Sequence, residues 1–359
     1  MYYQPGDQKL ISGTTGSDQD VVTNNSGHDG AFYINDEFEI TEKLSINAGV
    51  RFSYFGQVDA DSIQDADVFD ISRSYFNVEP RVAFRYSLGD ESSIKASFAR
   101  LNQYIHLVSS TTAALPVDQW LVSSDRLLPQ SANNYSLGYF RNFDTRYEAS
   151  TEVFYRDIFN AVEVKNFADL VLNPSIDDEI IQGSGRAYGL ELFLKKNTGR
   201  LKGSVAYTFS RSLNYLNLDG TEDWYPARID RPHNINVLVD LTISKKSKLA
   251  LNFVFTSGRP ITAPIASYNL GTIAVPHYEG RNAFRIPNYH RMDLSYTIKR
   301  NAIRRRKYQD YFTFSLYNVY GRRNAFSVFF RREENTAIQA YQLSVLGSIF
   351  PSVTYRFEF

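Results

Sequence analysis

The fold of this 359-residue chain is decided by the stretch from Ser45 to Tyr54, which reads SINAGVRFSY. Every second side chain is apolar or aromatic, namely Ile46, Ala48, Val50, Phe52 and Tyr54. The side chains between them are small or polar, namely Ser45, Asn47, Gly49, Arg51 and Ser53. Because successive side chains of a β-strand point to opposite faces, the alternation predicts a strand with one apolar and one polar face.

The same alternation recurs along the chain. Between Asn234 and Ser244 it has one breach, at Leu238, and between Tyr188 and Lys195 one breach, at Phe193. We count about thirteen such segments and almost no helical periodicity. Their predicted boundaries are 30–41, 44–56, 74–88, 92–107, 132–143, 147–164, 184–197, 201–214, 231–244, 247–261, 286–300, 308–331 and 338–359.

The predicted connections fall into two classes that alternate along the chain. Short turns occupy 42–43, 89–91, 144–146, 198–200 and 245–247, and long loops occupy 57–73, 108–131, 165–183, 215–230 and 262–285. Several segments also reach the roughly 9–11 residues that a tilted membrane-spanning strand needs. Long strands with short turns on one side and long loops on the other are typical of outer-membrane barrels.

Composition agrees with this fold and excludes several classes of function. The chain has 39 Lys plus Arg, 39 Asp plus Glu and no Cys, so neither a nucleic-acid partner nor a disulfide framework is expected. It is rich in aromatic residues, with 25 Tyr and 26 Phe. The mean hydropathy is −0.35. A barrel strand faces lipid on one side only, so a mildly polar average is compatible with a membrane barrel.

The two predicted faces differ as the wall of a closed barrel requires. In hydrocarbon the backbone must be paired within the protein, which only helices and closed barrels achieve. The polar rows would face the lumen with Arg51, Arg81, Arg85, Lys95, Glu152, Arg156, Glu191, Asp240, Asp293, Arg356 and Glu358. The strands of a large soluble β-fold would also show alternating side chains but would be shorter, so this interpretation is less favoured. The last strand ends in Tyr355, Phe357 and Phe359, which resembles the assembly signal of outer-membrane barrels.

Several motifs in order resemble TonB-dependent receptors, in the form common in Bacteroidetes. They are VEPR at 78–81, NQYIHL at 102–107, LPVDQW at 115–120, LPQ at 128–130, YSLGY at 135–139, GLE at 189–191, DRPHN at 230–234, SGRP at 257–260, YHRMDL at 289–294 and YNVYGRRN at 317–324. The resemblance implies a 22-stranded outer-membrane barrel with a plugged lumen. The segments found here would be strands 10 to 22 of that barrel.

The resemblance also implies parts that the sequence does not show. We find no signal peptide, plug domain, TonB box or first strands. We therefore expect residues 1–28 to be the remnant of an extracellular loop and 29–359 to be the C-terminal part of the barrel. About thirteen strands cannot close the even-numbered barrel of bacterial single-chain proteins, so two sheet edges are expected to need partners.

Candidate ligand-binding residues lie on the long loops, where binding residues concentrate. They are Trp120, Trp224, Tyr225, Tyr268, His277, Tyr278 and Arg281. Loop packing or an interfacial aromatic girdle is the alternative for these residues. His233 and His290 are expected to form hydrogen bonds at the barrel rim, with ligand contact as the alternative. The basic stretch 304–307 is expected to be a solvated periplasmic turn or a partner-binding patch.

No catalytic, metal-binding or cofactor motif is found. GxSxG and HExxH are absent, so the chain is expected not to be an enzyme. The resemblance implies energy-coupled uptake of an unknown small nutrient across the outer membrane, with a periplasmic C-terminus. The implied partners are outer-membrane lipid, the plug and N-terminal strands, the TonB complex acting through the plug, and the barrel assembly machinery. A passive porin-like or adhesin barrel and a soluble all-β carbohydrate-binding protein are the alternatives.

Overall fold

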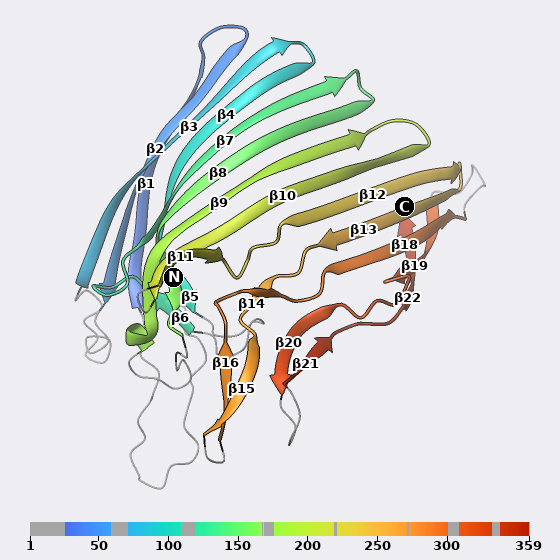
Figure 1. Cartoon of the computed structure of the whole chain (residues 1–359). Coiled ribbons are helices and arrows are strands. Elements are labelled where there is room, and N and C mark those ends of the chain that lie inside the picture. The colour runs from blue at the N-terminus through green and yellow to red at the C-terminus, as the bar shows by residue number, and fades with distance from the viewer. Residues whose placement is uncertain are drawn as a thin grey trace.

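A computed structural model describes residues 26–58, 71–108, 119–166, 168, 176–218, 221–270, 273–300, 309–331 and 338–358. Its main element is one antiparallel sheet, in which thirteen strands follow each other in the order β1-β2-β3-β4-β7-β8-β9-β10-β12-β13-β18-β19-β22 (Figure 1). Strand β11 pairs with β10 off this path. The thirteen predicted strand segments therefore correspond to thirteen neighbouring strands of one sheet.

The sheet strands are long. Their bounds are β1 Ser26–Glu39, β2 Leu44–Val58, β3 Ile71–Gly89, β4 Ser92–Gln103, β7 Gln130–Phe143, β8 Tyr147–Val164, β9 Ile180–Lys196, β10 Leu201–Leu218, β12 His233–Ser244, β13 Ser247–Thr256, β18 Tyr289–Lys299, β19 Gln309–Tyr317 and β22 Phe350–Glu358. With 12–19 residues in most of them, they reach the length needed to cross hydrocarbon at a tilt.

Smaller elements lie beyond the sheet. They are β5 Ile105–Val108, β6 Gln119–Val122, the 3₁₀-helix η1 Ile176–Glu179, β11 Thr221–Pro226, β14 Pro260–Ile261, β15 Pro264–Leu270, β16 Ile273–Tyr278, β17 Phe284–Arg285, β20 Ala325–Arg331 and β21 Gln339–Ser344. Within the described ranges, no helix is both long and apolar enough to cross a membrane.

The register aligns the alternating patterns of neighbouring strands into continuous rows. Leu194 pairs with Val205, Val205 with Val237, Val237 with Phe253, and Phe253 with Met292. Three positions along the strands, on the other face, Glu152 pairs with Glu191, Glu191 with Thr208, and Thr208 with Asn234. A shift of one residue would exchange the two faces, so the register is fixed by the alternation.

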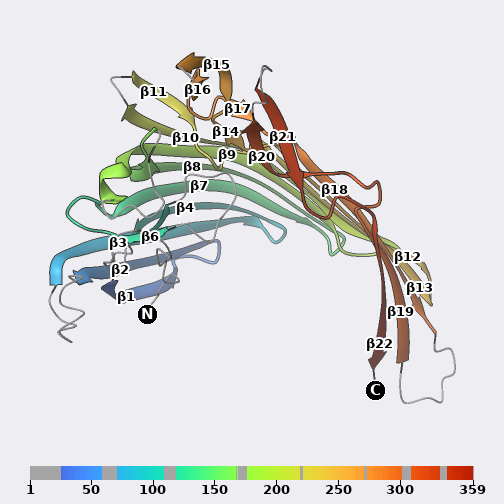
Figure 2. The same cartoon turned by 90° about the horizontal axis from the view of Figure 1, so that it is seen from below.

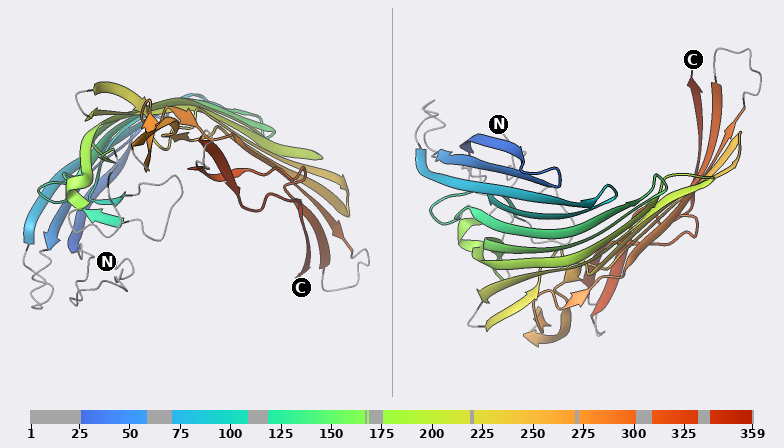
Figure 3. Two further views of the ribbon diagram at one scale, coloured as in Figure 1. Left: turned by 60° about the horizontal axis from the view of Figure 1, so that its bottom comes forward. Right: turned by 90° about the horizontal axis from the view of Figure 1, so that it is seen from above.

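The sheet curves into an arch (Figure 3). The β5–β6 hairpin and η1 lie on its concave side. On the convex side, many large side chains of the apolar row remain exposed, including Phe76, Leu137, Val153, Leu194 and Val353. An exposed apolar surface of this extent requires a nonaqueous or protein environment. Strands β1 and β22 stand at the two ends of the strand order.

The two classes of connection lie at opposite ends of the strands (Figures 1 and 2). The tight turns β1–β2, β3–β4, β7–β8, β9–β10 and β12–β13 share one end. The small hairpins and η1 gather at the other end, which we call the loop end. Two small buried clusters lie there, one around Val108, Leu121 and Leu127 and the other around Ile261, Ala263 and Ile286.

Four predicted segments are wrong in extent, because each is divided in the structure. Segment 92–107 is interrupted at Tyr104, and 247–261 stops at Thr256 before the short β14. Segment 308–331 divides into β19 and β20, and 338–359 divides into β21 and β22. The backbone takes positive φ values at Asn318 (55°), Gly321 (62°) and Leu346 (53°). Such residues interrupt the regular ladder, since an extended strand requires negative φ.

Two predicted regions fall mostly outside the described residues. Of the predicted loop remnant 1–28, residues 26–28 begin β1 and the rest lie outside the described ranges. The basic stretch 304–307 also lies outside them. The division into 1–28 and 29–359 stays a prediction.

Candidate functional site: a polar cleft on the concave face

The site begins with the pairing of β2 and β3. Arg51 pairs with Glu79, Ser53 with Asn77, and Gly49 with Arg81. All of these positions belong to the polar row of the alternation, so their side chains share the concave face. The VEPR motif therefore places Glu79 and Arg81 beside Arg51.

Tyr104 covers this part of the sheet. It stands between β4 and β5, and its ring stacks on Phe55 with centroids 5.1 Å apart and planes inclined by 6°. Its hydroxyl lies 2.7 Å from the Ser53 hydroxyl and accepts a hydrogen bond from Asn77 Nδ2 at 2.9 Å. Since the β5–β6 hairpin follows directly, these contacts hold the hairpin against the sheet.

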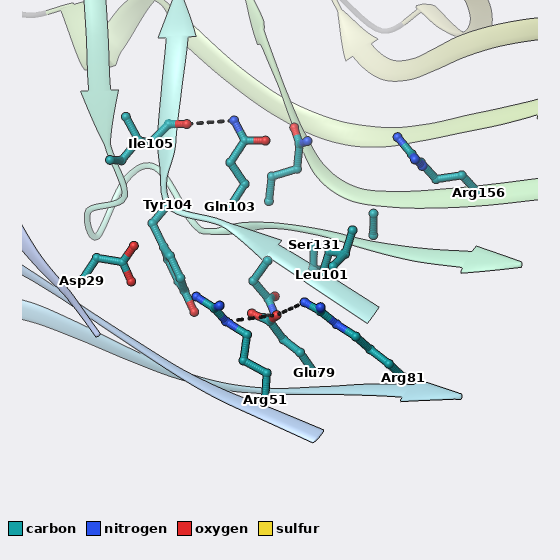
Figure 4. A pocket seen from close by; sticks show the side chains of 13 residues that line it. Asp29, Arg51, Glu79, Arg81, Leu101, Gln103, Tyr104, Ile105, Ser131 and Arg156 are labelled. Atoms are coloured by element: carbon teal, nitrogen blue, oxygen red, sulfur yellow. Dashed lines mark hydrogen bonds and ion pairs between the residues drawn. The ribbon is translucent and has the colours of Figure 1, made fainter. Parts of the chain in front are cut away.

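Glu79 is the buried charge of the site, with 3% of its surface exposed. Its Oε1 accepts hydrogen bonds from the Ser53 hydroxyl at 2.8 Å and from Asn102 Nδ2 at 3.4 Å. Its Oε2 lies 3.7 Å from Arg51 Nε and 3.5 Å from Arg81 Nη2 (Figure 4). The carboxylate is thus compensated by two cations and two neutral donors, as a buried charge requires.

These residues border an open cleft of about 520 Å³, within the size range of small-molecule sites. Arg51, Glu79 and Arg81 form one wall, and Tyr104 and Ile105 form another (Figure 4). Further lining comes from Asp29, Leu101, Asn102, Gln103, Gln130, Ser131, Ala132 and Arg156. Within the described part of the chain, no group of three or more His, Cys, Asp or Glu side chains could hold a metal ion.

Two of the predicted ligand residues, Tyr225 and Arg281, come together elsewhere at the loop end. The Arg281 guanidinium lies 5.6 Å from the centroid of the Tyr225 ring and donates to Glu163 Oε2 at 2.6 Å. Both partners of this ion pair are largely buried, with side-chain exposures of 14% and 8%. Burial, followed by the nearby Glu163 charge, raises the pKa of Tyr225 above its usual range. The arrangement favours packing between loops for these two residues.

The other predicted ligand residues are spread over separate hairpins. Trp224 lies on β11, where the Arg186 guanidinium stands 4.0 Å from its ring centroid. Trp120 lies on β6 opposite Leu107. Tyr268 lies on β15, and His277 and Tyr278 on β16. The structure does not bring these side chains to the cleft, and their role in ligand binding stays a prediction.

The predicted assembly signal lies on β22. Tyr355 contacts the ring of Phe312 on β19 with centroids 4.9 Å apart, and both Tyr355 and Phe357 are exposed. Phe359 lies outside the described residues. Recognition by an assembly machinery stays a prediction.

The DRPHN motif connects several segments at the loop end. In DRPHN the fully buried Asp230 carboxylate forms ion pairs with Arg285 and Arg211. It also accepts a hydrogen bond from the Ser212 amide at 2.6 Å. These contacts join β10, the β10–β12 connection and β17.

The two histidines predicted to form rim hydrogen bonds do so. His233 Nδ1 lies 3.0 Å from the Tyr207 hydroxyl, and His290 Nδ1 lies 2.8 Å from the Tyr320 hydroxyl. The first bond joins β12 to β10, and the second joins β18 to the connection that follows β19. This agrees with the structural role expected for both residues.

Alternation alone places Arg51, Arg81 and Arg156 in the polar rows, but it does not show that they line one cleft with Glu79 and Tyr104. One signal was available for Glu79. It stands in the VEPR motif two residues before Arg81, so strand periodicity places both on one face. Tyr104 gave no such signal, because its position depends on a break in an otherwise continuous alternation.

The fold and the chemistry of its two faces define the class of protein. The chain forms an arched antiparallel sheet of thirteen long strands with an apolar convex face and a polar concave face. Its short turns lie at one end of the strands and its longer connections at the other. These features are those of the wall of an outer-membrane β-barrel.

Comparison with known families makes the assignment specific. The model of the TonB dependent receptor-like β-barrel family matches residues 2–321. The chain belongs to this family of outer-membrane receptors and transporters. A comparison with curated proteins gives no match.

Solved structures share the fold at low sequence identity. The FrpB iron transporter of Neisseria meningitidis matches with 14% identity, a TM-score of 0.60 and coverage of 93% of this chain and 46% of its own. The ferric-catecholate import receptor Fiu of E. coli K12 has 14% identity, a TM-score of 0.60 and coverage of 96% and 47%. The ferric yersiniabactin uptake receptor FyuA of Yersinia pestis has 16% identity, a TM-score of 0.58 and coverage of 93% and 46%.

This chain therefore spans about half the length of the solved structures it matches. At these identities the likeness concerns the fold alone. The Bacteroidetes form of the family stays a prediction.

Proposed function

We propose that the chain forms part of the wall of an outer-membrane receptor that takes up a small nutrient in an energy-coupled manner. The observation that carries this proposal is the division of the sheet into an apolar convex face and a polar concave face. The convex row from Leu194 to Met292 can contact acyl chains, and the concave row from Glu152 to Asn234 can line a wet lumen.

In this proposal the loop end faces the cell exterior, and the short turns and the C-terminus face the periplasm. The loop end supports this orientation, because it carries the small hairpins (Figure 1). Gln103, Tyr104 and Gln130, at the same end of β4 and β7, also line the cleft. Long connections are extracellular and short turns periplasmic in barrels of this type. Export, insertion and strand pairing would depend on the barrel assembly machinery.

The energy for uptake would come from a TonB complex acting through a plug held inside the barrel. Polar concave side chains such as Glu152 and Glu191 are suited to hold a plug by ion pairs and hydrogen bonds. In this role the chain binds and conducts a solute and performs no covalent chemistry. Its nearest partners are then outer-membrane lipid, the plug and the strands that complete the barrel.

The names of the solved neighbours point to iron or ferric-chelate transport for those proteins. Iron chelates are therefore one candidate substrate class for this chain. Because the likeness shows only the fold, the chain's own cleft is the better guide to its ligand.

The experiment is a comparison of solute uptake in the source bacterium with and without the intact gene. Depletion of a mixed nutrient medium would be followed by mass spectrometry, with and without a protonophore. We expect loss of the gene to abolish uptake of one solute or a narrow set, and the protonophore to abolish the same uptake in the parent strain. Uptake that depends on the gene but is unchanged by the protonophore would support a passive porin-like barrel and contradict the proposal.

A further inference from the structure

The cleft holds an excess of positive charge. Three guanidinium groups, those of Arg51, Arg81 and Arg156, face two carboxylates, those of Asp29 and Glu79. At neutral pH these five groups leave one net positive charge. In a partly enclosed cleft this charge is screened less than it would be on an open surface.

The guanidinium groups retain capacity for another acceptor. Arg51 and Arg81 approach the same oxygen, Glu79 Oε2, at 3.7 and 3.5 Å. Charge-assisted hydrogen bonds are roughly 2.7–2.9 Å long, so neither arginine is engaged in a close bidentate pair with Glu79. Their side chains are also 38% and 48% exposed.

Arg156 adds a third guanidinium from β8. Its Nε donates to Asn134 Oδ1, and among the described residues its terminal nitrogens have no hydrogen-bond partner. Among the described residues, no carboxylate lies within salt-bridge distance of Arg156. An arginine with a neutral partner and an open end is suited to bind an oxyanion.

We propose that this cleft binds the carboxylate or phosphate group of a small solute. The proposal deepens the proposed function, because it names the chemical class of a solute that enters from the loop end. The guanidinium groups would bind the oxyanion. The amides of Asn102, Gln103 and Gln130 provide donors and acceptors for the rest of the solute, and a cleft of about 520 Å³ has room for such a molecule.

The test is isothermal titration of the full 359-residue chain in neutral detergent micelles at pH 7 and constant ionic strength. The probes are citrate, inorganic phosphate and, as the uncharged control, glucose. We expect at least one of the two anions to bind and glucose not to bind. The anion that binds more tightly identifies the oxyanion as carboxylate or phosphate.

Two variants should move the affinity in opposite directions. Arg156→Gln removes one guanidinium and should weaken anion binding by roughly tenfold to a hundredfold, the usual contribution of a charged hydrogen bond. Glu79→Gln keeps an oxygen for the Ser53 hydroxyl but removes the competing charge. It should strengthen binding by roughly threefold to tenfold, because Arg51 and Arg81 are then released toward the solute.

Matched controls distinguish the effect of the cleft residues from the electrostatic effect of other charges on the concave face. Arg85→Gln and Glu152→Gln make the same changes of charge at other positions of the concave polar rows, and each should change affinity by less than about twofold. Circular dichroism of every variant should show an unchanged β-sheet spectrum.

Three results would overturn the proposal. They are absence of binding of both anions by the parent chain, equal effects of Arg156→Gln and Arg85→Gln, and weaker binding by a folded Glu79→Gln chain. Energy-independent uptake in cells would instead contradict the proposed function and leave the binding result standing. The two failures are thereby distinguishable.

Discussion

At the scale of single residues, Tyr104 is the side chain that connects the sheet to the β5–β6 hairpin. Its hydroxyl contacts Ser53 and Asn77, and the Ser123 amide donates to its backbone carbonyl at 2.8 Å. The hydroxyl is buried together with Ser53, whose exposed fraction is 1%. Removing it would leave two polar groups without this partner.

We predict that Tyr104→Phe lowers the free energy of unfolding by roughly 1–3 kcal/mol, because buried polar groups then lose a hydrogen-bond partner. The measurement is denaturant unfolding of the chain in detergent, followed by tryptophan fluorescence. Tyr139→Phe, at a partly exposed position of the convex face, is the control and should change the same energy by less than about 0.5 kcal/mol. Equal effects of the two variants would contradict the role given to Tyr104.

His106 makes the β5–β6 hairpin sensitive to pH. The residue is 3% exposed, lies off the main sheet, and its Nε2 has no partner within the described ranges. Burial lowers the pKa of His106 from 6.5 to about 4. The folded state therefore binds this proton less readily than the unfolded state does.

The sign of the effect follows from this lowered pKa. Stability from His106 is fully present above about pH 6.5 and is lost as the pH falls toward 4, by roughly 3 kcal/mol in total. Unfolding midpoints between pH 7.5 and 4 should fall more steeply for the parent chain than for His106→Leu. Parallel pH profiles of the two proteins would show that His106 is not buried in its neutral form.

At the scale of elements, alternation predicted the existence and order of the strands but not every place where a strand ends. Neighbouring strands and tight turns follow local rules, so segments such as 44–56 and 147–164 were close to their observed bounds. The division of 308–331 could not be read in this way, since Ala325–Arg331 also has extended backbone. Its separation from β19 depends on the positive φ values of Asn318 and Gly321, which the alternation of side chains does not indicate.

Asn318 is the clearest example of such an ending. It is 1% exposed at a φ of 55°, its Nδ2 donates to the Arg322 carbonyl at 3.0 Å, and its Oδ1 accepts from the Arg322 amide at 3.1 Å. We predict that Asn318→Ala destabilises the fold by roughly 2–4 kcal/mol, through lost hydrogen bonds and left-handed strain.

Limited proteolysis and denaturant unfolding would measure this effect. Cleavage near the β19–β20 connection should become faster in Asn318→Ala than in Asn236→Ala, whose asparagine lies in the middle of β12. Unchanged stability and protection in Asn318→Ala would contradict a specific role for this turn.

The candidate site was less predictable than the fold. The alternation placed Arg51, Arg81 and Arg156 on one face, but they come from β2, β3 and β8. That all three line one cleft depends on sheet curvature and on the hairpin that follows Tyr104. The loop residues Tyr225 and Arg281 were predicted to bind ligand, yet they lie beside Glu163, far from them in sequence. Loop packing of this kind has no local sequence signature.

At the scale of the whole molecule, the proposed place of the sheet in the membrane depends on which face of the arch meets hydrocarbon. The rows are continuous over many strands, so one assignment holds for the entire sheet. Val237 and Leu241 of β12 belong to the convex row, and Asn236 and Asp240 to the concave row. Neighbouring positions of one strand therefore sample both environments.

The most direct measurement is electron paramagnetic resonance of single spin labels at these positions, in the intact protein reconstituted into lipid bilayers. Labels at Val237 and Leu241 should collide with oxygen, which concentrates among acyl chains, and be protected from a water-soluble nickel chelate. Labels at Asn236 and Asp240 should show the reverse preference if the lumen side is wet. Chelate access at Val237 and Leu241, combined with oxygen access at Asn236 and Asp240, would contradict the account.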